Sequence, residues 1–149
     1  MKINWELKTF NELSVMELYT ILQLRAEVFV VEQNCPYLDT DGKDLKCFHL
    51  MGYDEKAALI AYSRIVPAGI SFKEVSIGRV VSSPNVRNTG AGKALMQKAI
   101  EEIKLKFGET PIRIGAQLYL QKFYESFGFV LASDEYLEDN IPHIEMLLN

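Results

Sequence analysis

A glycine-rich segment, Arg87-Asn88-Thr89-Gly90-Ala91-Gly92, contains the residues whose types and spacing most clearly suggest chemistry. Glycines in the first turn of a helix let the backbone approach a ligand, and the free N–H groups and the helix dipole there favour an anion. A Walker loop would need Gly at position 87 and Ser or Thr at position 94, and a dinucleotide fingerprint would need Gly or Ala at position 95. The chain has Arg87, Ala94 and Leu95 instead. The segment therefore predicts either a phosphate site of another type or a strand-to-helix turn without a ligand.

The elements on both sides of this segment would hold it in place. Residues 75–82 are rich in β-branched side chains and predict a buried strand, in which Gly78 indicates a bulge or a close backbone approach. Apolar residues at steps of four predict a long amphipathic helix over Ala91–Phe107, which Gly108 should end. Residues 112–117 predict a second buried strand. Strand, helix and strand in this order predict a parallel crossover.

Tyr124 lies in a short aromatic helix pattern within residues 118–129. Leu120, Phe123, Tyr124 and Phe127 would share one face of that helix, which is typical of a core stripe. A tyrosine hydroxyl on such a face needs a hydrogen-bond partner or a function. Gly128 should end the helix before a strand that begins at Phe129.

Two groups of potential metal ligands fail the tests of spacing. Asp39 and Asp41 suggest a calcium loop, but Leu50 stands where the closing Glu would fall if Asp39 were the first ligand. We expect a solvated acidic turn there, which would attract a cationic substrate. Cys47 and His49 lack a second pair of zinc ligands, so His49 is expected to be a buried, hydrogen-bonded histidine. No metal site is predicted.

The remaining chain alternates helix and strand patterns. Ser14 and Glu17 form a capping box for a helix that should end near Glu32. Its apolar face is expected to consist of Val15, Leu18, Leu22, Ala26 and Phe29. Further strands are predicted at residues 5–10, 46–53, 57–66 and 143–148, with an acidic loop at residues 134–140.

Composition limits the class of protein. The chain has 149 residues, 48% of them hydrophobic, which predicts a single domain over residues 1–149 with a sizeable core. The net charge of −4 and the absence of a Lys/Arg run argue against nucleic-acid binding. No apolar run is long enough to span a membrane, and the N-terminal MKINWELK lacks the apolar core of a signal peptide. With only two cysteines, a cytoplasmic location is expected.

Five separated motifs carry a resemblance to a known family. They are the segment from Phe29 to Tyr37 (FVVEQNCPY), IGRVV ending at Val81, GAQ ending at Gln117, FY ending at Tyr124 with FGF ending at Phe129, and IPHI ending at Ile144. Together with the order of the predicted elements and the Arg-x-x-Gly-x-Gly segment, they resemble the ElaA-like branch of the GNAT N-acetyltransferase superfamily. The resemblance covers essentially the whole chain. It implies an α/β fold with a central mixed, twisted sheet of six to seven strands flanked by helices.

The resemblance also implies an acyl-CoA site in the V between two parallel central strands, with acetyl-CoA as co-substrate. Backbone groups of Val80, Val81 and Ser82 would pair with the pantetheine arm. The pyrophosphate would be held by the main chain of Arg87, Asn88, Thr89, Gly90, Ala91, Gly92 and Lys93, and Gln117 and Tyr124 would complete the site. Asn88 stands where many relatives have glycine, and asparagine tolerates unusual backbone angles.

The implied reaction is acetyl transfer to a primary amine by direct attack. Tyr124 matches the family tyrosine that protonates the departing thiolate, and a backbone N–H near Val80 would polarise the thioester carbonyl. The general base stays open among Glu32, His143 and Glu145, in that order, while Glu74 lies at the start of the central strand and is expected to be too distant.

Several alternatives stay open at this point. Cys35 could form an acyl-enzyme, although no base is predicted beside it. A non-catalytic acyl-CoA-binding regulatory module would keep the glycine loop without turnover. The acceptor is expected to be a cationic amine because of the acidic loops, but its identity is not encoded in these patterns. A homodimer is the commonest assembly, and no residue demonstrates one.

Overall fold

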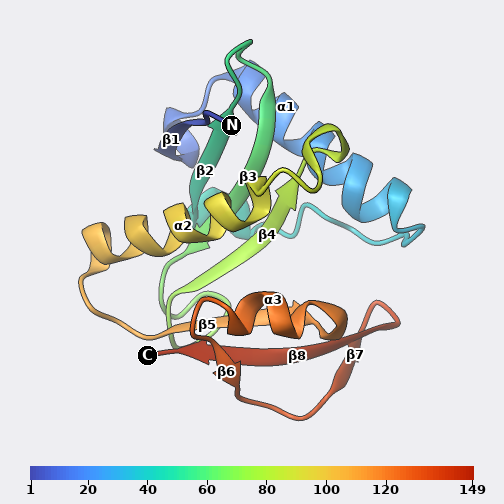
Figure 1. Cartoon of the computed structure of the whole chain (residues 1–149), viewed down its shortest axis with the longest axis vertical. Helices are drawn as coiled ribbons and strands as arrows, with labels where there is room; N and C mark the ends of the chain where they lie inside the picture. The colour runs from blue at the N-terminus through green and yellow to red at the C-terminus, as the bar shows by residue number, and fades with distance from the viewer.

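The computed structural model describes residues 1–149 as two four-stranded sheets with three α-helices (Figure 1). The first sheet has the antiparallel order β1 (Asn4–Thr9), β2 (Phe48–Tyr53), β3 (Leu59–Val66) and β4 (Ser76–Ser82). In the second sheet, β8 (Ile141–Leu148) pairs antiparallel with β5 (Ile112–Gln117), β6 (Val130–Leu131) and β7 (Tyr136–Glu138). Four 3₁₀ turns lie at Phe10–Glu12, Lys43–Lys46, Pro84–Val86 and Leu118–Leu120.

The two sheets are joined where β4 and β5 begin. Val75 and Ile112 form a parallel bridge, in which the Arg113 N–H donates to the Val75 carbonyl oxygen at 3.0 Å. Beyond this point β4 and β5 have no paired residues and run apart (Figure 1). The predicted α/β fold and its parallel crossover are confirmed, with eight strands in two joined sheets in place of one sheet of six to seven.

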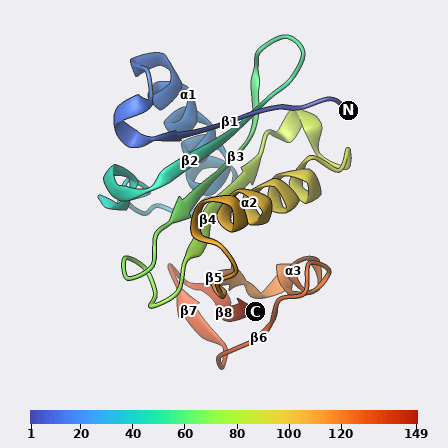
Figure 2. The same ribbon diagram turned by 90° about the vertical axis from the view of Figure 1, so that its left-hand side faces the viewer.

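Helix α2 (Ala91–Phe107) covers one face of the first sheet (Figure 2). Its bounds are those predicted, and Gly108 ends it at a φ of 75°. Leu95, Met96, Ala99 and Ile103 are buried in a core that also includes Tyr124 and Phe129 from the second half of the chain. This single core fixes α2, and hence the glycine-rich segment before it, relative to both sheets.

Helix α1 (Val15–Arg25) continues as a π-helix over Ala26–Glu32 and packs on the other side of the first sheet. The Ser14–Glu17 capping box is confirmed, with Glu17 N–H donating to Ser14 Oγ at 3.0 Å. The predicted apolar face is wrong at Val15, which is 86% exposed, and at Ala26, whereas Leu18, Leu22 and Phe29 are half-buried. The buried residues are Ile21, Leu24, Arg25 and Val28. An amphipathic pattern assigns an arginine to the surface. The buried face of α1 is rotated because Arg25 instead turns inward to buried carboxylates.

The C-terminal third contains one element that the sequence reading placed in a loop. Helix α3 (Gln121–Glu125) lies within the predicted aromatic helix pattern but ends before Gly128, and β7 (Tyr136–Glu138) lies within the predicted acidic loop. Glu138 pairs with Ile141, and the intervening Asp139 and Asn140 have φ values of 50° and 65°. Asp-Asn is a favourable pair for such a two-residue hairpin turn, so the signal was present. None of the helices has the length and apolarity needed to cross a bilayer.

Candidate active site

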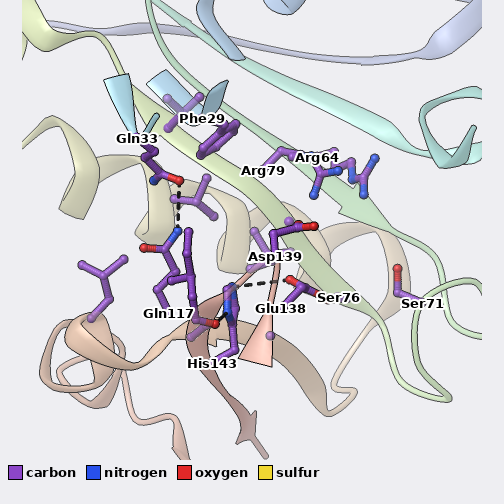
Figure 3. Close-up of a pocket in the computed structure, with 18 of the residues that line it drawn as sticks. Phe29, Gln33, Arg64, Ser71, Ser76, Arg79, Gln117, Glu138, Asp139 and His143 are labelled. Atoms are coloured by element: carbon purple, nitrogen blue, oxygen red, sulfur yellow. Dashed lines mark hydrogen bonds and ion pairs between the residues drawn. The ribbon is translucent and has the colours of Figure 1, made fainter. Parts of the chain in front are cut away.

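A cleft of about 900 Å³ lies between β4 and the second sheet (Figure 3). Of the predicted co-substrate residues, its lining includes Val80, Val81, Ser82, Arg87, Gln117 and Tyr124. The residues from Asn88 to Lys93 lie outside the lining, at the start of α2. The divergence of β4 from β5 therefore produces the cleft, and the strands β3, β4, β5, β7 and β8 all contribute to its lining.

Strand β4 carries a bulge where it faces this cleft. Its pairing with β3 runs from Ile65–Ile77 to Arg64–Gly78 and then resumes at Tyr62–Val81, so two residues, Arg79 and Val80, lie opposite Ser63. Arg79 has a φ of 50°, which is unusual for a residue other than glycine. A bulge removes backbone groups from the regular ladder and re-aims them. The bulge predicted near Gly78 is confirmed one residue later.

The glycine-rich segment forms an uncapped helix start. Gly90 is the N-cap of α2 with a φ of 88° and no side-chain cap, and the Ala94 N–H makes the first helical hydrogen bond, to Gly90 O at 3.0 Å. The first-turn N–H groups that precede Ala94 have no partner within a helix. Asn88 has a φ of 63°, which agrees with the expectation that asparagine would tolerate an unusual angle. The backbone here has the form of an anion site.

Tyr124 is 7% exposed and packs edge-on against Phe123 and Phe129. Burial raises the pKa of its phenol to about 12, and no hydrogen bond contributes to that shift. The phenol is therefore protonated at neutral pH. It borders the cleft without serving the chain's own hydrogen-bond network.

His143 lies on β8, between Gln117 on β5 and Tyr136 on β7. Its Nδ1 is 2.7 Å from the Ile141 carbonyl oxygen, which can only accept, so Nδ1 carries the hydrogen. This leaves Nε2 to exchange a proton, and Nε2 is 3.4 Å from Glu138 Oε2. The ring is 8% exposed and lines the cleft, where Figure 3 shows it beside Gln117. The lone pair of Nε2 can accept a proton from a molecule in the cleft.

The other candidates for the base are bound to arginines. Glu32 pairs with Arg87 and does not line the cleft. Glu145 does line it, but Arg113 donates both to Glu145 Oε1 and to Glu74 Oε1, at 3.1 Å each. The hydrogen bond from Arg113 also holds the pKa of Glu74 below its ordinary value. Both carboxylates are therefore engaged by an arginine side chain, and the choice among Glu32, His143 and Glu145 stays a prediction.

Cys35 lines the cleft and is buried. Its thiol makes one hydrogen bond, at 3.7 Å to the Asp139 carbonyl oxygen, which cannot take a proton as a base would. Cys47, the second free cysteine, is also buried, and burial raises the pKa of its thiol to about 11. The arrangement gives no support for an acyl-enzyme.

The acidic turn at residues 39–44 is solvated only in part: Asp41 is exposed, as predicted, while Asp39 and Asp44 are buried. Arg25, fully buried, donates to Asp39 Oδ2 and to Asp44 Oδ1 at 2.8 Å each. Arg64 Nη1 donates to Asp41 Oδ1 at 2.8 Å and to Asp44 Oδ1 at 3.0 Å. Arg79 Nε donates to Asp39 Oδ1 at 2.8 Å. Three arginines thus balance three aspartates, and this turn offers no free negative charge to a cationic acceptor.

The same region confirms the prediction for His49. The side chain is 1% exposed, with Nδ1 2.6 Å from Tyr62 Oη and Nε2 2.9 Å from the Asp44 carbonyl oxygen. Both ring nitrogens are therefore engaged within the chain, and His49 helps to hold the Asp44 turn.

Sequence reasoning missed several cleft residues. Gln33 Oε1 accepts from Gln117 Nε2 at 3.5 Å, which links the end of the π-helix to β5 (Figure 3). Lys43 and Glu138 also line the cleft. Of these, only Gln33 belonged to a segment that the motifs had singled out. Lys43 reaches the cleft from the acidic turn at residues 39–44, and Glu138 reaches it from the β7–β8 hairpin.

Comparisons with known proteins agree with this fold. Residues 40–149 match the family described as "Acetyltransferase (GNAT) domain". Protein ElaA of Escherichia coli (strain K12) is 45% identical over 146 residues, or 97% of this chain and 95% of that protein. The crystal structure of Escherichia coli ElaA superposes with a TM-score of 0.92 at 43% identity, covering 99% of this chain and 100% of that one.

Two further solved structures are informative. An acyl-CoA N-acyltransferase from Pseudomonas aeruginosa has a TM-score of 0.92 and 43% identity, with 98% of this chain and 99% of that chain covered. An aminoglycoside 6′-N-acetyltransferase complexed with coenzyme A shares the fold at a TM-score of 0.69 and 15% identity, with 96% of each chain covered. The family match spans most of the sequence, and the relatives match over nearly their full length. The chain belongs to the GNAT acetyltransferase family.

Proposed function

We propose that this chain is an enzyme that transfers an acetyl group from acetyl-CoA to a primary amine by direct attack. The observation that carries the proposal is the position of Tyr124, a protonated phenol with no hydrogen bond of its own, beside a cleft that a bulged strand also borders. The names of the Pseudomonas aeruginosa acyl-CoA N-acyltransferase and of the aminoglycoside acetyltransferase with bound coenzyme A point to the same class of reaction.

The residues present fit an acyl-CoA. The uncapped first turn of α2 offers N–H groups and a positive dipole end to a pyrophosphate, and a side-chain carbon built at Gly90 would meet no atom within 4 Å. The β4 edge from Val80 to Ser82 borders the cleft, where a pantetheine amide would find backbone partners. Arg87 at the rim would add a charged donor for phosphate.

Different groups of the chain would perform different steps of the reaction. Acetyl-CoA supplies the acetyl group as a thioester; the amine nitrogen forms the new N–C bond as the C–S bond breaks. The re-aimed N–H of Val80 would stabilise the negative charge that develops on the carbonyl oxygen. His143 Nε2 would take the proton from the attacking nitrogen, and the Tyr124 phenol would protonate the departing sulfur. Exchange with water afterwards restores both side chains, so the chain gains no net proton.

His143→Gln should lower kcat about tenfold, because the variant keeps a hydrogen-bonding side chain but cannot take a proton. The effect is limited because water in an open cleft can substitute for a base. Glu145→Gln serves as the comparison, and a larger loss in that variant than in His143→Gln would transfer the role to Glu145.

Glu32→Gln should strengthen acetyl-CoA binding about threefold to tenfold in calorimetric titration, because Glu32 competes with the pyrophosphate for Arg87. Glu109→Gln, which changes an exposed glutamate beyond the opposite end of α2, should leave the affinity nearly unchanged. Weaker binding by Glu32→Gln would mean that Glu32 orients Arg87 for the phosphate instead of competing for it.

The test of the proposed function is the release of free thiol from acetyl-CoA across a panel of amines. Release that depends on the amine supports the transferase. Binding of acetyl-CoA without release from any amine would favour a non-catalytic acyl-CoA-binding regulatory module. An absence of binding would mean that the glycine-rich segment is only a strand-to-helix turn.

A further inference from the structure

One side of the cleft, formed by the first sheet and the Lys43–Lys46 turn, has hydrogen-bond donors that the chain does not use. Lys43 Nζ donates to Ser71 Oγ at 3.1 Å and has no carboxylate within salt-bridge distance. Arg79 uses Nε and Nη2 on Asp39 and Asp41, while its Nη1 has no partner and its side chain is 22% exposed. Both residues line the cleft. We call Lys43, Arg64 and Arg79 the basic wall.

Arg64 adds a donor behind these two. Its Nε is buried without a hydrogen-bond partner, although the rest of its guanidinium binds Asp41 and Asp44. It lies next to the backbone of Gly78, where the first carbon of a side chain would be 3.5 Å from Nε. An unpaired donor on a charged group raises the local positive potential and favours an anion nearby. The three arginines balance the three aspartates of the turn, so Lys43 leaves this wall with one excess positive charge.

The side of the cleft formed by the second sheet has the opposite charge. Glu138, whose side chain is 63% exposed, pairs only with His143, and Asp139 follows it in the β7–β8 turn. The carboxylate of Asp139 has no ion-pair partner in the chain, and both residues line the cleft. Figure 3 shows Glu138 beside His143, while Arg64 and Arg79 come from the strands of the first sheet. We call Glu138 and Asp139 the acidic wall.

We propose that the acceptor is a small zwitterion, an amine that also carries a carboxylate; this inference rests on the proposed function. The acidic wall would draw the amino group toward His143, which must take its proton. The basic wall would bind the carboxylate through Lys43 Nζ and the free Nη1 of Arg79. A polyamine has nothing to offer the basic wall and would be repelled by it, and a plain alkylamine would leave its donors unpaired.

The test compares matched acceptors in the thiol-release assay. One series consists of ω-amino carboxylates with one to six methylenes, and each is paired with its methyl ester and with the alkylamine of the same length. We expect kcat/KM for the best ω-amino carboxylate to exceed that of its ester and alkylamine at least about tenfold, as for a hydrogen-bonded charge pair. The best chain length would report the span between the two walls.

Lys43→Met should reduce this preference about tenfold, whereas Lys43→Arg should retain it because the charge is kept. The control is Lys46→Met, which removes an exposed lysine of the same 3₁₀ turn that does not line the cleft. Its preference should match that of the wild type. A loss in Lys46→Met equal to that in Lys43→Met would indicate a general charge effect and would overturn the assignment.

The remaining outcomes separate this inference from the proposed function. Thiol release could be as efficient with spermidine or alkylamines as with every ω-amino carboxylate. That result would overturn the proposal of a zwitterionic acceptor while leaving the proposed acetyl transfer intact. No release with any amine would overturn the proposed function and this inference with it. Preference for carboxylates that survives Lys43→Met would show that the anion binds elsewhere, and would overturn the role of the basic wall.

Discussion

Tyr124→Phe should lower kcat about a hundredfold while leaving the dissociation constant of acetyl-CoA nearly unchanged. The substitution removes only the phenol oxygen, and that oxygen takes no part in the hydrogen bonds of the chain. Burial that raises the phenol pKa to about 12 also disfavours a charged thiolate in the same surroundings, so a positioned proton matters most when the C–S bond breaks. Steady-state kinetics and calorimetric titration together measure the two quantities.

The structure provides a control for this variant. Tyr119→Phe removes a phenol that also borders the cleft but is 75% exposed, and its turnover should stay within about twofold of the wild type. The melting temperature of Tyr124→Phe should be close to that of the wild type, because phenylalanine fills the same space. Undiminished turnover in Tyr124→Phe would remove the proposed acid, and a matching loss of affinity would make Tyr124 a binding residue.

Arg25→Met should lower the free energy of unfolding by about 3 to 5 kcal/mol, because it leaves buried carboxylates without their main partner. Arg25 is 0% exposed, and no water can replace its hydrogen bonds to Asp39 and Asp44. Lys98→Met, which removes a surface pair with Glu102 on α2, should cost about 0.5 kcal/mol or less. Urea unfolding of the three proteins gives the comparison. Equal stabilities of wild type and Arg25→Met would show that the charges in this cluster contribute little.

The pH dependence of the stability difference between wild type and Arg25→Met tests whether ion pairing causes that difference. Burial alone would raise the pKa of Asp44, but the hydrogen bonds and charge of Arg25 and Arg64 outweigh it and hold that pKa below its ordinary value. The carboxylate therefore stabilises the fold fully above the pKa of an unfolded aspartate, about 4, and this contribution is lost as the pH falls toward the lowered value. The gap between wild type and Arg25→Met should narrow below about pH 4.

Much of the fold could be predicted because its signals are local. The bounds of α2 follow from apolar residues at steps of four and from a terminal glycine, and both are visible in the sequence. The buried face of α1 could not be predicted in this way. Its position depends on Arg25, whose burial makes sense only once Asp39 and Asp44 are known to fold over it. The strand β7 was missed because its acidic composition outweighed the turn signal of Asp139-Asn140.

In the candidate site, too, the features with local sequence signals could be predicted and those set by tertiary contacts could not. The glycine-rich segment and Tyr124 were identified from contiguous motifs, and the structure brings Tyr124 to the cleft while the uncapped turn lies at the start of α2. The arginine partners of Glu32 and Glu145 could not be predicted, because they come from distant parts of the chain. The charges of the basic and acidic walls are likewise set by tertiary pairing, which decides which of many charged side chains stay free.

The most direct test of the central claim follows the acetyl group itself. The wild-type protein would be incubated with acetyl-CoA carrying a ¹³C-labelled acetyl group and an amine acceptor, and the products would be identified by mass spectrometry. We expect a labelled acetyl group on the acceptor nitrogen, formed in equal amount with free CoA and strongly reduced in Tyr124→Phe. Free CoA formed without any acetylated amine would show hydrolysis in place of transfer and would contradict the account.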